Sequence, residues 1–292
     1  MDTAYFYEVR CSMEFGKVKL FNKENKIKIK LSQISWDELF DDKSILFNAI
    51  CDLILDEKNL LYYATQKEST KNLVDTRNYV DSLIKNNNLI YAIDDVFNAL
   101  GWNDEINIGN TRFQGDLAEY LMSILLDKFT NVETLISKIS FKTSSKMSVY
   151  GNDNVYFDYE NDILYFGESK FYQEANKGLD EALKSIENHS TIEEISFVRE
   201  HTSSFIAENG EKRIKVVEKY ENAYIDNLNI RSIIFIMNQD LYKRESYEEM
   251  LIDYFKDRES LQQKTEEIIL VFLPILSKKE FLEFFVRRVN NG

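Results

Sequence analysis

Residues 151–172 read GNDNVYFDYENDILYFGESKFY, and they decide the fold because two strands and a turn follow one another within them. Residues 155–159 and 163–166 are rich in aromatic and β-branched side chains, which favour strands. The residues between them, Glu-Asn-Asp at 160–162, are turn formers. The stretch therefore predicts a β-hairpin whose second strand runs into the tripeptide Glu-Ser-Lys at 168–170.

The hairpin turn can centre on either of two dipeptides within residues 160–162, and the choice decides which residue lies opposite Asp153. One register places Asp153 opposite Glu168, and the other places it opposite Lys170. Side chains alternate between the faces of a strand, so Glu168 and Lys170 share a face and Ser169 points away from it. In both registers Asp153 lands on the face of Glu168 and Lys170.

Asp158 is the rival acidic residue of this hairpin. With a two-residue loop it pairs with residue 163 or 165 and points to the face opposite Glu168. With a three-residue loop it returns to that face but lies roughly 13 Å along the strand from Glu168. Asp153 is therefore the predicted partner of Glu168 and Lys170.

Asp153, Glu168 and Lys170 would converge on a strand pair that is otherwise apolar, where an unpartnered charge is costly to bury. A divalent cation would account for them, because Mg²⁺ prefers oxygen ligands and often takes one or two carboxylates together with water and phosphate. A lysine beside the metal can orient or deprotonate a water, or hold the scissile phosphate. The three residues fit metal-assisted phosphodiester hydrolysis. The alternative is a surface hairpin whose charges form a solvated ion pair.

A helix is predicted upstream of the hairpin, from Gln114 to about Phe129. Its apolar side chains recur at helical spacing, and Glu119 lies at the edge of this stripe, in line with Met122. Glu119 is thus expected to lean toward the core, although it could instead reach water or pair with a lysine. Asp116 falls in the first turn of this predicted helix, where it would complement the helix dipole.

The composition constrains the class of protein. The 292 residues carry a formal net charge of −14, whereas a protein that holds nucleic acid by many phosphate contacts is usually basic. A nuclease of this composition needs a local basic groove or a partner that delivers the substrate. The only histidines, His189 and His201, argue against a histidine-rich zinc site, and Cys11 and Cys51 are expected to be buried free thiols. We expect a cytoplasmic protein, because the apolar runs are too short to span a membrane.

The rest of the chain predicts strands and helices that alternate in its second part. Strands are expected at 4–9, 18–21, 27–31, 138–143, 232–237 and 267–272, and helices at 43–55, 72–85, 89–100, 174–188, 242–262 and 277–289, with residues 192–225 mostly helical. This order predicts an α/β (α+β) fold with a mixed central sheet flanked by helices. A break after residue 100 divides the chain into an N-terminal α+β region, residues 1–105, which could dock a partner, and a second domain, residues 106–292.

The order of the acidic residues is similar to that of a known superfamily. Glu119 on a helix, Asp153 before a strand and Glu168-x-Lys170 on the next strand resemble the PD-(D/E)xK nucleases, which share a restriction-endonuclease-like core. The proline that usually precedes the aspartate is replaced here by Asn152.

A narrower resemblance is carried by GDLAEYL at 115–121, the G-x-D at 151–153 and LYFGESKFY at 164–172. These motifs resemble the HamA family, the nuclease subunits of Hachiman anti-phage defence systems. The motifs that carry the resemblance span roughly residues 111–177. The first third of the chain resembles the family only in its length.

The resemblance implies a catalytic set made of Glu119, Asp153, Glu168 and Lys170, in which the three carboxylates hold one or two Mg²⁺ or Mn²⁺ ions. It also implies cleavage of DNA in a complex with a helicase subunit, HamB, that uses ATP. The chain itself contains no G-x-x-x-x-G-K-[ST] loop, so ATP use would fall to that partner.

Two other functions compete with a DNA nuclease. The first is a catalytically silent regulatory or partner-binding subunit on the same core, which the acidic charge and the N-terminal third would suit. The second is a nuclease that acts on RNA, although no RNA-binding signature is visible.

Overall fold

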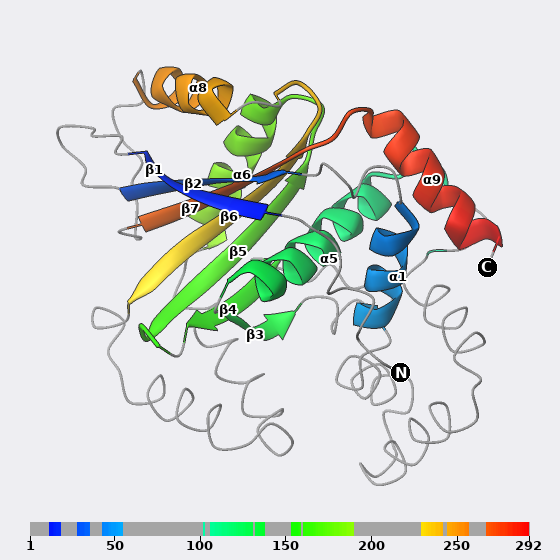
Figure 1. The fold of residues 1–292 in the computed structure, drawn as a ribbon, viewed down its shortest axis with the longest axis horizontal. Helices are drawn as coiled ribbons and strands as arrows, with labels where there is room; N and C mark the ends of the chain where they lie inside the picture. The colour runs from blue at the N-terminus through cyan, green and yellow to red at the C-terminus, as the bar shows by residue number, and fades with distance from the viewer. Residues whose placement is uncertain are drawn as a thin grey trace, which may run out of the picture.

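The computed structural model describes residues 12–18, 28–35, 43–54, 102, 106–130, 132–137, 153–158, 160–189, 229–241, 244–256 and 267–291. Figure 1 shows a central sheet with helices against it. The strands are β1 (Ser12–Val18), β2 (Lys28–Ser35), β3 (Glu133–Ser137), β4 (Asn154–Asp158), β5 (Ile163–Phe171), β6 (Ile230–Asn238) and β7 (Glu267–Pro274). The helices are α1 (Lys43–Ile54), α5 (Thr111–Phe129), α6 (Ala175–His189), α8 (Arg244–Lys256) and α9 (Lys278–Asn291).

The strands form one mixed sheet in the order β1-β2-β7-β6-β5-β4-β3. Its centre is parallel, because β2, β7, β6 and β5 pair in parallel. Both margins are antiparallel, since β1 pairs with β2 at one side while β4 and β3 follow β5 at the other. The expected α/β fold with a mixed sheet flanked by helices is therefore confirmed.

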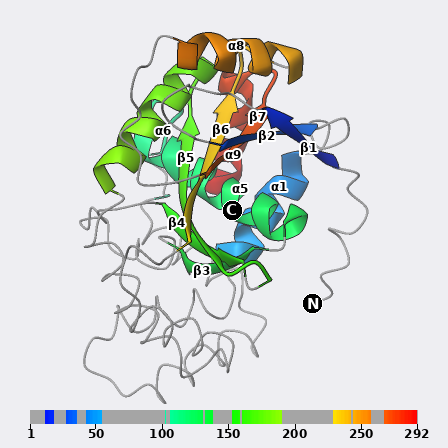
Figure 2. The same ribbon diagram turned by 90° about the vertical axis from the view of Figure 1, so that its left-hand side faces the viewer.

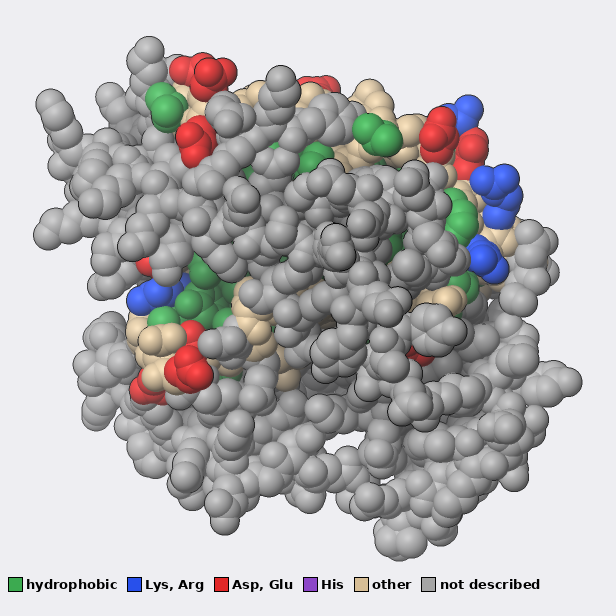
Figure 3. All heavy atoms as spheres, in the orientation of Figure 1, with side chains coloured by type: hydrophobic (Ala, Val, Ile, Leu, Met, Phe, Trp, Pro, Cys, Tyr) green, Lys and Arg blue, Asp and Glu red, His purple; other side chains and the backbone are tan. Residues whose placement is uncertain are grey.

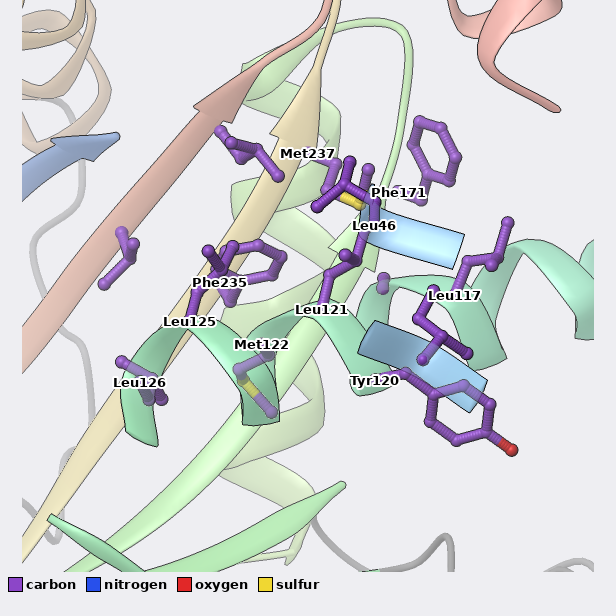
Figure 4. Packing of buried hydrophobic residues seen from close by; sticks show 14 of the residues in the cluster. Leu46, Leu117, Tyr120, Leu121, Met122, Leu125, Leu126, Phe171, Phe235 and Met237 are labelled. Atoms are coloured by element: carbon purple, nitrogen blue, oxygen red, sulfur yellow. The ribbon is translucent and has the colours of Figure 1, made fainter. Parts of the chain in front are cut away.

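Two helical layers cover the sheet (Figures 1 and 2). Ile234 and Ile236 of β6 belong to an apolar cluster with side chains of α6 and α8. The intervening Phe235 belongs to a second cluster, which contains side chains of α5, α1 and α9. Figure 4 shows Leu121 and Leu125 of α5 near Phe235. The alternation along β6 thus separates an α6/α8 face from an α5/α9 face.

Short-range signals define the ends of several elements. Asn110 caps α5 by accepting a hydrogen bond from the N–H of Phe113 at 3.0 Å. Ser277 precedes α9 and accepts from the N–H of Glu280 at 3.2 Å, as its sequence spacing predicts. In the hairpin turn, the carboxylate of Asp158 accepts from the N–H groups of Glu160 and Asn161, both at 3.0 Å.

The N-terminal third contributes to the same sheet and core. β1 and β2 extend the sheet beyond β7, and Leu46 and Ile50 of α1 lie in the cluster that contains α5 and α9. The predicted boundary near residue 105 therefore does not divide this sheet or this core. The division into two functional units stays a prediction.

Two predicted boundaries differ from the structure. The helix expected from Gln114 begins at Thr111, because the cap is Asn110. A strand was expected at 138–143, whereas β3 occupies Glu133–Ser137 and residues 138–143 lie outside the described part. The predictions for residues 4–9, 72–85, 89–100 and 192–225 also lie outside it.

Candidate active site

The candidate site lies where β4 and β5 part. The two strands pair from Asp158 opposite Ile163 to Asn154 opposite Gly167. β5 continues to Phe171, and along this last stretch it is paired with β6 on its other side. Within the described residues, the edge of β5 that faces away from β6 thus loses its strand partner after Gly167. The observed pairing is the register that places Asp153 next to Glu168.

Asp153 is hydrogen-bonded to this open edge of β5. Its main-chain N–H donates to the carbonyl oxygen of Gly167 at 2.9 Å. Its carboxylate oxygen Oδ2 accepts two hydrogen bonds from Ser169, one from the main-chain N–H and one from the hydroxyl, each at 2.8 Å. The side chain therefore takes the position that a carbonyl group of β4 would occupy if the ladder continued.

The prediction that Ser169 points away from the face of Glu168 and Lys170 is confirmed, but the carboxylate of Asp153, which was expected on that face, binds Ser169 instead. Ser169 pairs with Phe235 and so lies on the α5/α9 face, as alternation requires. Asp153, however, precedes the first residue of β4, and its carboxylate reaches the edge of β5 where the N–H and the hydroxyl of Ser169 are both accessible to it. Ser169 is a site residue that sequence reasoning missed, and its place between Glu168 and Lys170 was the one available signal.

Glu168 and Lys170 form an ion pair on the other face. They pair with Ile234 and Ile236 of β6, whose side chains belong to the α6/α8 cluster. The Nζ of Lys170 donates to Oε1 of Glu168, and the Glu168 residue is 2% exposed. A Cβ placed on Gly178 of α6 would lie 3.8 Å from the Cβ of Lys170, so α6 covers this pair closely.

The charge of Lys170 is set by opposing effects. Burial lowers the pKa of its ammonium group, but the negative charges of Glu168 and Asp153 raise it by more, and the net shift is upward. Lys170 is therefore a cation at neutral pH. Asp153 is hydrogen-bonded to Gly167 and Ser169, on either side of Glu168, and Glu168 is paired with Lys170, so the structure places the three residues along one segment of β5. Their joint role as a site stays a prediction.

Glu119 approaches from the opposite side of the sheet. It is 8% exposed, which confirms that it leans toward the core, and it belongs to α5 on the α5/α9 face. It lies close to Tyr156, whose pKa is raised by burial and further by the charges of Asp153 and Glu119. Glu119 thus neighbours the Asp153 end of the site, while Glu168 and Lys170 lie across the sheet. Its role as a metal ligand stays a prediction.

A metal site in this region would rest on two carboxylates. Within the described part of the chain, no group of three or more His, Cys, Asp or Glu residues is placed to hold an ion. Asp153 and Glu168, 8% and 2% exposed, supply buried oxygen donors on neighbouring strand segments. This donor set fits Mg²⁺ or Mn²⁺, which can bind through one or two carboxylates and complete their shells with water.

The two other acidic residues considered have structural roles. Asp158 stabilises the hairpin turn and lies at its tip, away from Asp153, as predicted. The interpretation of Asp116 as a first-turn dipole residue is wrong, because α5 begins at Thr111. Asp116 is 2% exposed and accepts a hydrogen bond from Nε1 of Trp102 at 3.0 Å.

The described residues on the face drawn in Figure 3 do not form a single basic groove. On the face drawn in Figure 3, the Lys and Arg side chains of the described residues lie in separate patches, next to Asp and Glu side chains. Among the helices that the structure describes, none is long and apolar enough to cross a membrane.

Comparison with known proteins places the chain in a family. A search of curated proteins gives no match. A family model, HamA, matches residues 15–289, which is almost the entire chain; the match includes every described element from β2 to β7 and most of β1 and α9. The chain belongs to the HamA family.

Proposed function

We propose that this protein is a metal-dependent DNA nuclease on a PD-(D/E)xK core, and that it is the effector subunit of a Hachiman anti-phage defence complex. The observation that carries the proposal is the attachment of Asp153 to the strand segment that bears Glu168 and Lys170. Membership of the HamA family supports the defence role.

Asp153 and Glu168 are the proposed ligands of Mg²⁺ or Mn²⁺, with Glu119 as a third ligand from α5. A bound ion would supply Lewis-acid stabilisation of the phosphate and a more acidic water. Glu168 is held by its ion pair with Lys170, and Asp153 by Ser169. The two carboxylates therefore come from positions that need little rearrangement on binding.

Lys170 is the proposed contact to the scissile phosphate. It is cationic, and its side chain is 24% exposed, so it can reach a ligand at the open edge of β5. In the absence of substrate its ammonium group neutralises the buried Glu168 carboxylate. A positive charge at this point would favour the transition state, in which negative charge grows on the phosphate oxygens.

The charge of the chain supports a partner that handles DNA. A formal net charge of −14 disfavours tight binding of DNA by this subunit alone. We propose that a helicase subunit, HamB, loads on DNA with ATP and presents a strand to the open edge of β5. Residues 1–105 are the proposed docking region, and the complex is proposed to act in the cytoplasm.

The proposal is tested by DNA cleavage with the assembled complex in the presence of Mg²⁺ or Mn²⁺. Glu168→Ala and Lys170→Ala should each abolish cleavage without dissociating the complex. A matched control is the exposed ion pair between Glu174, just before α6, and Lys177 of α6, whose charged atoms lie 2.9 Å apart, so Glu174→Ala and Lys177→Ala should cleave normally. Unchanged cleavage by both site variants would reject the nuclease proposal.

The competing proposal is a catalytically silent subunit that binds the partner. One observation favours it: within the described residues the carboxylates do not form a three-membered metal cluster. This alternative predicts that the complex assembles and functions without a divalent metal at this site, and that Glu168→Ala has no effect on defence.

A further inference from the structure

We propose that Ser169 is a positioning residue, whose hydroxyl holds the carboxylate of Asp153 in the orientation that binds the metal. The inference rests on the proposed function, since it concerns the same site. It assigns a role to the residue between Glu168 and Lys170, a position that the E-x-K spacing leaves unspecified.

The geometry of the contact supports this role. The N–H and the hydroxyl of Ser169 both donate to Oδ2 of Asp153, each at 2.8 Å. One hydrogen bond would leave the carboxylate able to swing about it, whereas two donors from different directions restrict its rotation. Hydrogen bonds to a charged acceptor are also stronger than neutral ones. Ser169 is 4% exposed, so water competes little for this contact.

The contact also couples the two proposed ligands. Asp153 lies just before β4, outside the regular ladder. Ser169 is the immediate neighbour of Glu168 on β5. The hydrogen bonds to Ser169 fix the position of the Asp153 carboxylate relative to β5. Because β5 also carries Glu168, this strand sets the distance between the two carboxylates.

The hydroxyl is the part of this contact that a side-chain substitution can remove. Ser169→Ala keeps the main-chain N–H but deletes the second donor. Groups that orient a metal ligand typically change metal affinity by about 10–100-fold when they are lost. We therefore expect a weaker metal site in a protein that is otherwise folded.

The test is titration of the protein with Mn²⁺ alone, in which the electron paramagnetic resonance signal of the ion reports the concentration of free Mn²⁺. Ser169→Ala should raise the Kd for Mn²⁺ by about 10-fold or more. The matched control is Ser232→Ala, because Ser232 is a fully buried serine on the neighbouring strand β6 whose hydroxyl has no hydrogen-bond partner among the described residues. This control should bind Mn²⁺ like the wild type.

A second pair separates the hydroxyl from the shape of the side chain. Ser169→Thr retains a hydroxyl and Ser169→Val replaces it with a methyl group of similar volume, so any strain from the larger side chain is common to both. The Ser169→Thr variant should bind Mn²⁺ at least about 10-fold more tightly than the Ser169→Val variant.

Each outcome has a distinct meaning. Equal Mn²⁺ affinity of the Ala variant and the wild type, or of the Thr and Val variants, would overturn the role of Ser169 while leaving the nuclease proposal intact. Equal weakening by Ser169→Ala and Ser232→Ala would also overturn it, because the effect would then belong to sheet stability. A wild-type chain that binds no Mn²⁺ would overturn the metal site itself and this inference with it.

Discussion

Oδ2 of Asp153 accepts hydrogen bonds from both the main-chain N–H and the hydroxyl of Ser169, each at 2.8 Å. This contact joins the residue just before the hairpin's first strand to the E-x-K segment of its second strand. It closes the gap that opens when β4 leaves β5 after Gly167. The acidic residue nearest to Glu168 is thus held by the protein in advance of any ligand.

Asp153 and Asp158 belong to the same hairpin but should respond differently to substitution. Asp153→Asn removes a charged ligand and should lower the rate of metal-dependent DNA cleavage by about 100-fold or more. Removing one preorganised electrostatic contact from an active site typically has an effect of about this size. Asp158→Asn keeps an oxygen that can accept from the turn N–H groups and should cleave like the wild type. The measurement is the initial rate of plasmid cleavage by the assembled complex. Equal losses in both variants would show that the effect lies in the hairpin and not in the site.

Gly167 is predicted to be intolerant of any side chain. A Cβ at this position would lie 2.7 Å from Cε2 of Tyr156 and 3.3 Å from the terminal methyl carbon of Met122. Gly167→Ala should lower the free energy of unfolding by about 1–3 kcal/mol through overpacking. Gly115→Ala on α5 is the matched control, because a Cβ there meets nothing within 4 Å. It should raise stability by about 0.5–1 kcal/mol, since alanine favours a helix. Urea unfolding of both variants checks the prediction, and a Gly167→Ala protein as stable as the wild type would contradict it.

Lys278 should make the free energy of unfolding depend on pH in the alkaline range. Its Nζ donates to the carbonyl oxygen of Phe171 at 2.7 Å, and burial lowers the pKa of its ammonium group from 10.5 to about 8. Between these two values the unfolded chain holds a proton that the folded chain has lost, so unfolding becomes less favourable as pH rises. Below pH 8 both states are protonated and this contribution does not change.

The measurement for Lys278 is the difference in unfolding free energy between wild type and Lys278→Met, taken at a series of pH values. The wild type should gain stability relative to the variant as pH rises from about 8 toward 10.5. Lys279→Met, at an exposed neighbouring lysine, controls for charge removal at the start of α9. A difference that stays constant across this range, or falls, would contradict the assignment.

The hairpin was predictable from sequence because its signals are local. Residues 155–159 and 163–166 favour strands and flank a turn, and the structure shows β4 and β5 in the first of the two predicted registers. The burial of Glu119 followed from its place at the edge of an apolar stripe. The start of α5 was missed although two local signals mark it: Phe113 lies four residues before Leu117, at helical spacing, and Asn110 is a preferred capping residue. The role assigned to Asp116 was wrong as a consequence.

The tertiary parts of the site were not available from sequence. Strand alternation gives the relative faces of Glu168, Ser169 and Lys170, but it assumes that the ladder continues on both strands. The ladder ends at Asn154, which frees the carboxylate of Asp153 to bind Ser169. Which face of the sheet α5 covers is decided by its packing against β5 and β6, so the separation of Glu119 from Glu168 needed the fold.

The most direct test of the central claim is a crystal structure of the complete chain grown or soaked with Mn²⁺, using the anomalous signal of the metal to locate it. We expect a peak at the open edge of β5, coordinated by carboxylate oxygens of both Asp153 and Glu168, with Lys170 displaced from Glu168. The peak should disappear in Asp153→Asn and persist in Asp158→Asn. A peak that lies elsewhere, or a site at this edge that stays empty at saturating Mn²⁺, would contradict the proposal that these residues form a metal-dependent active site.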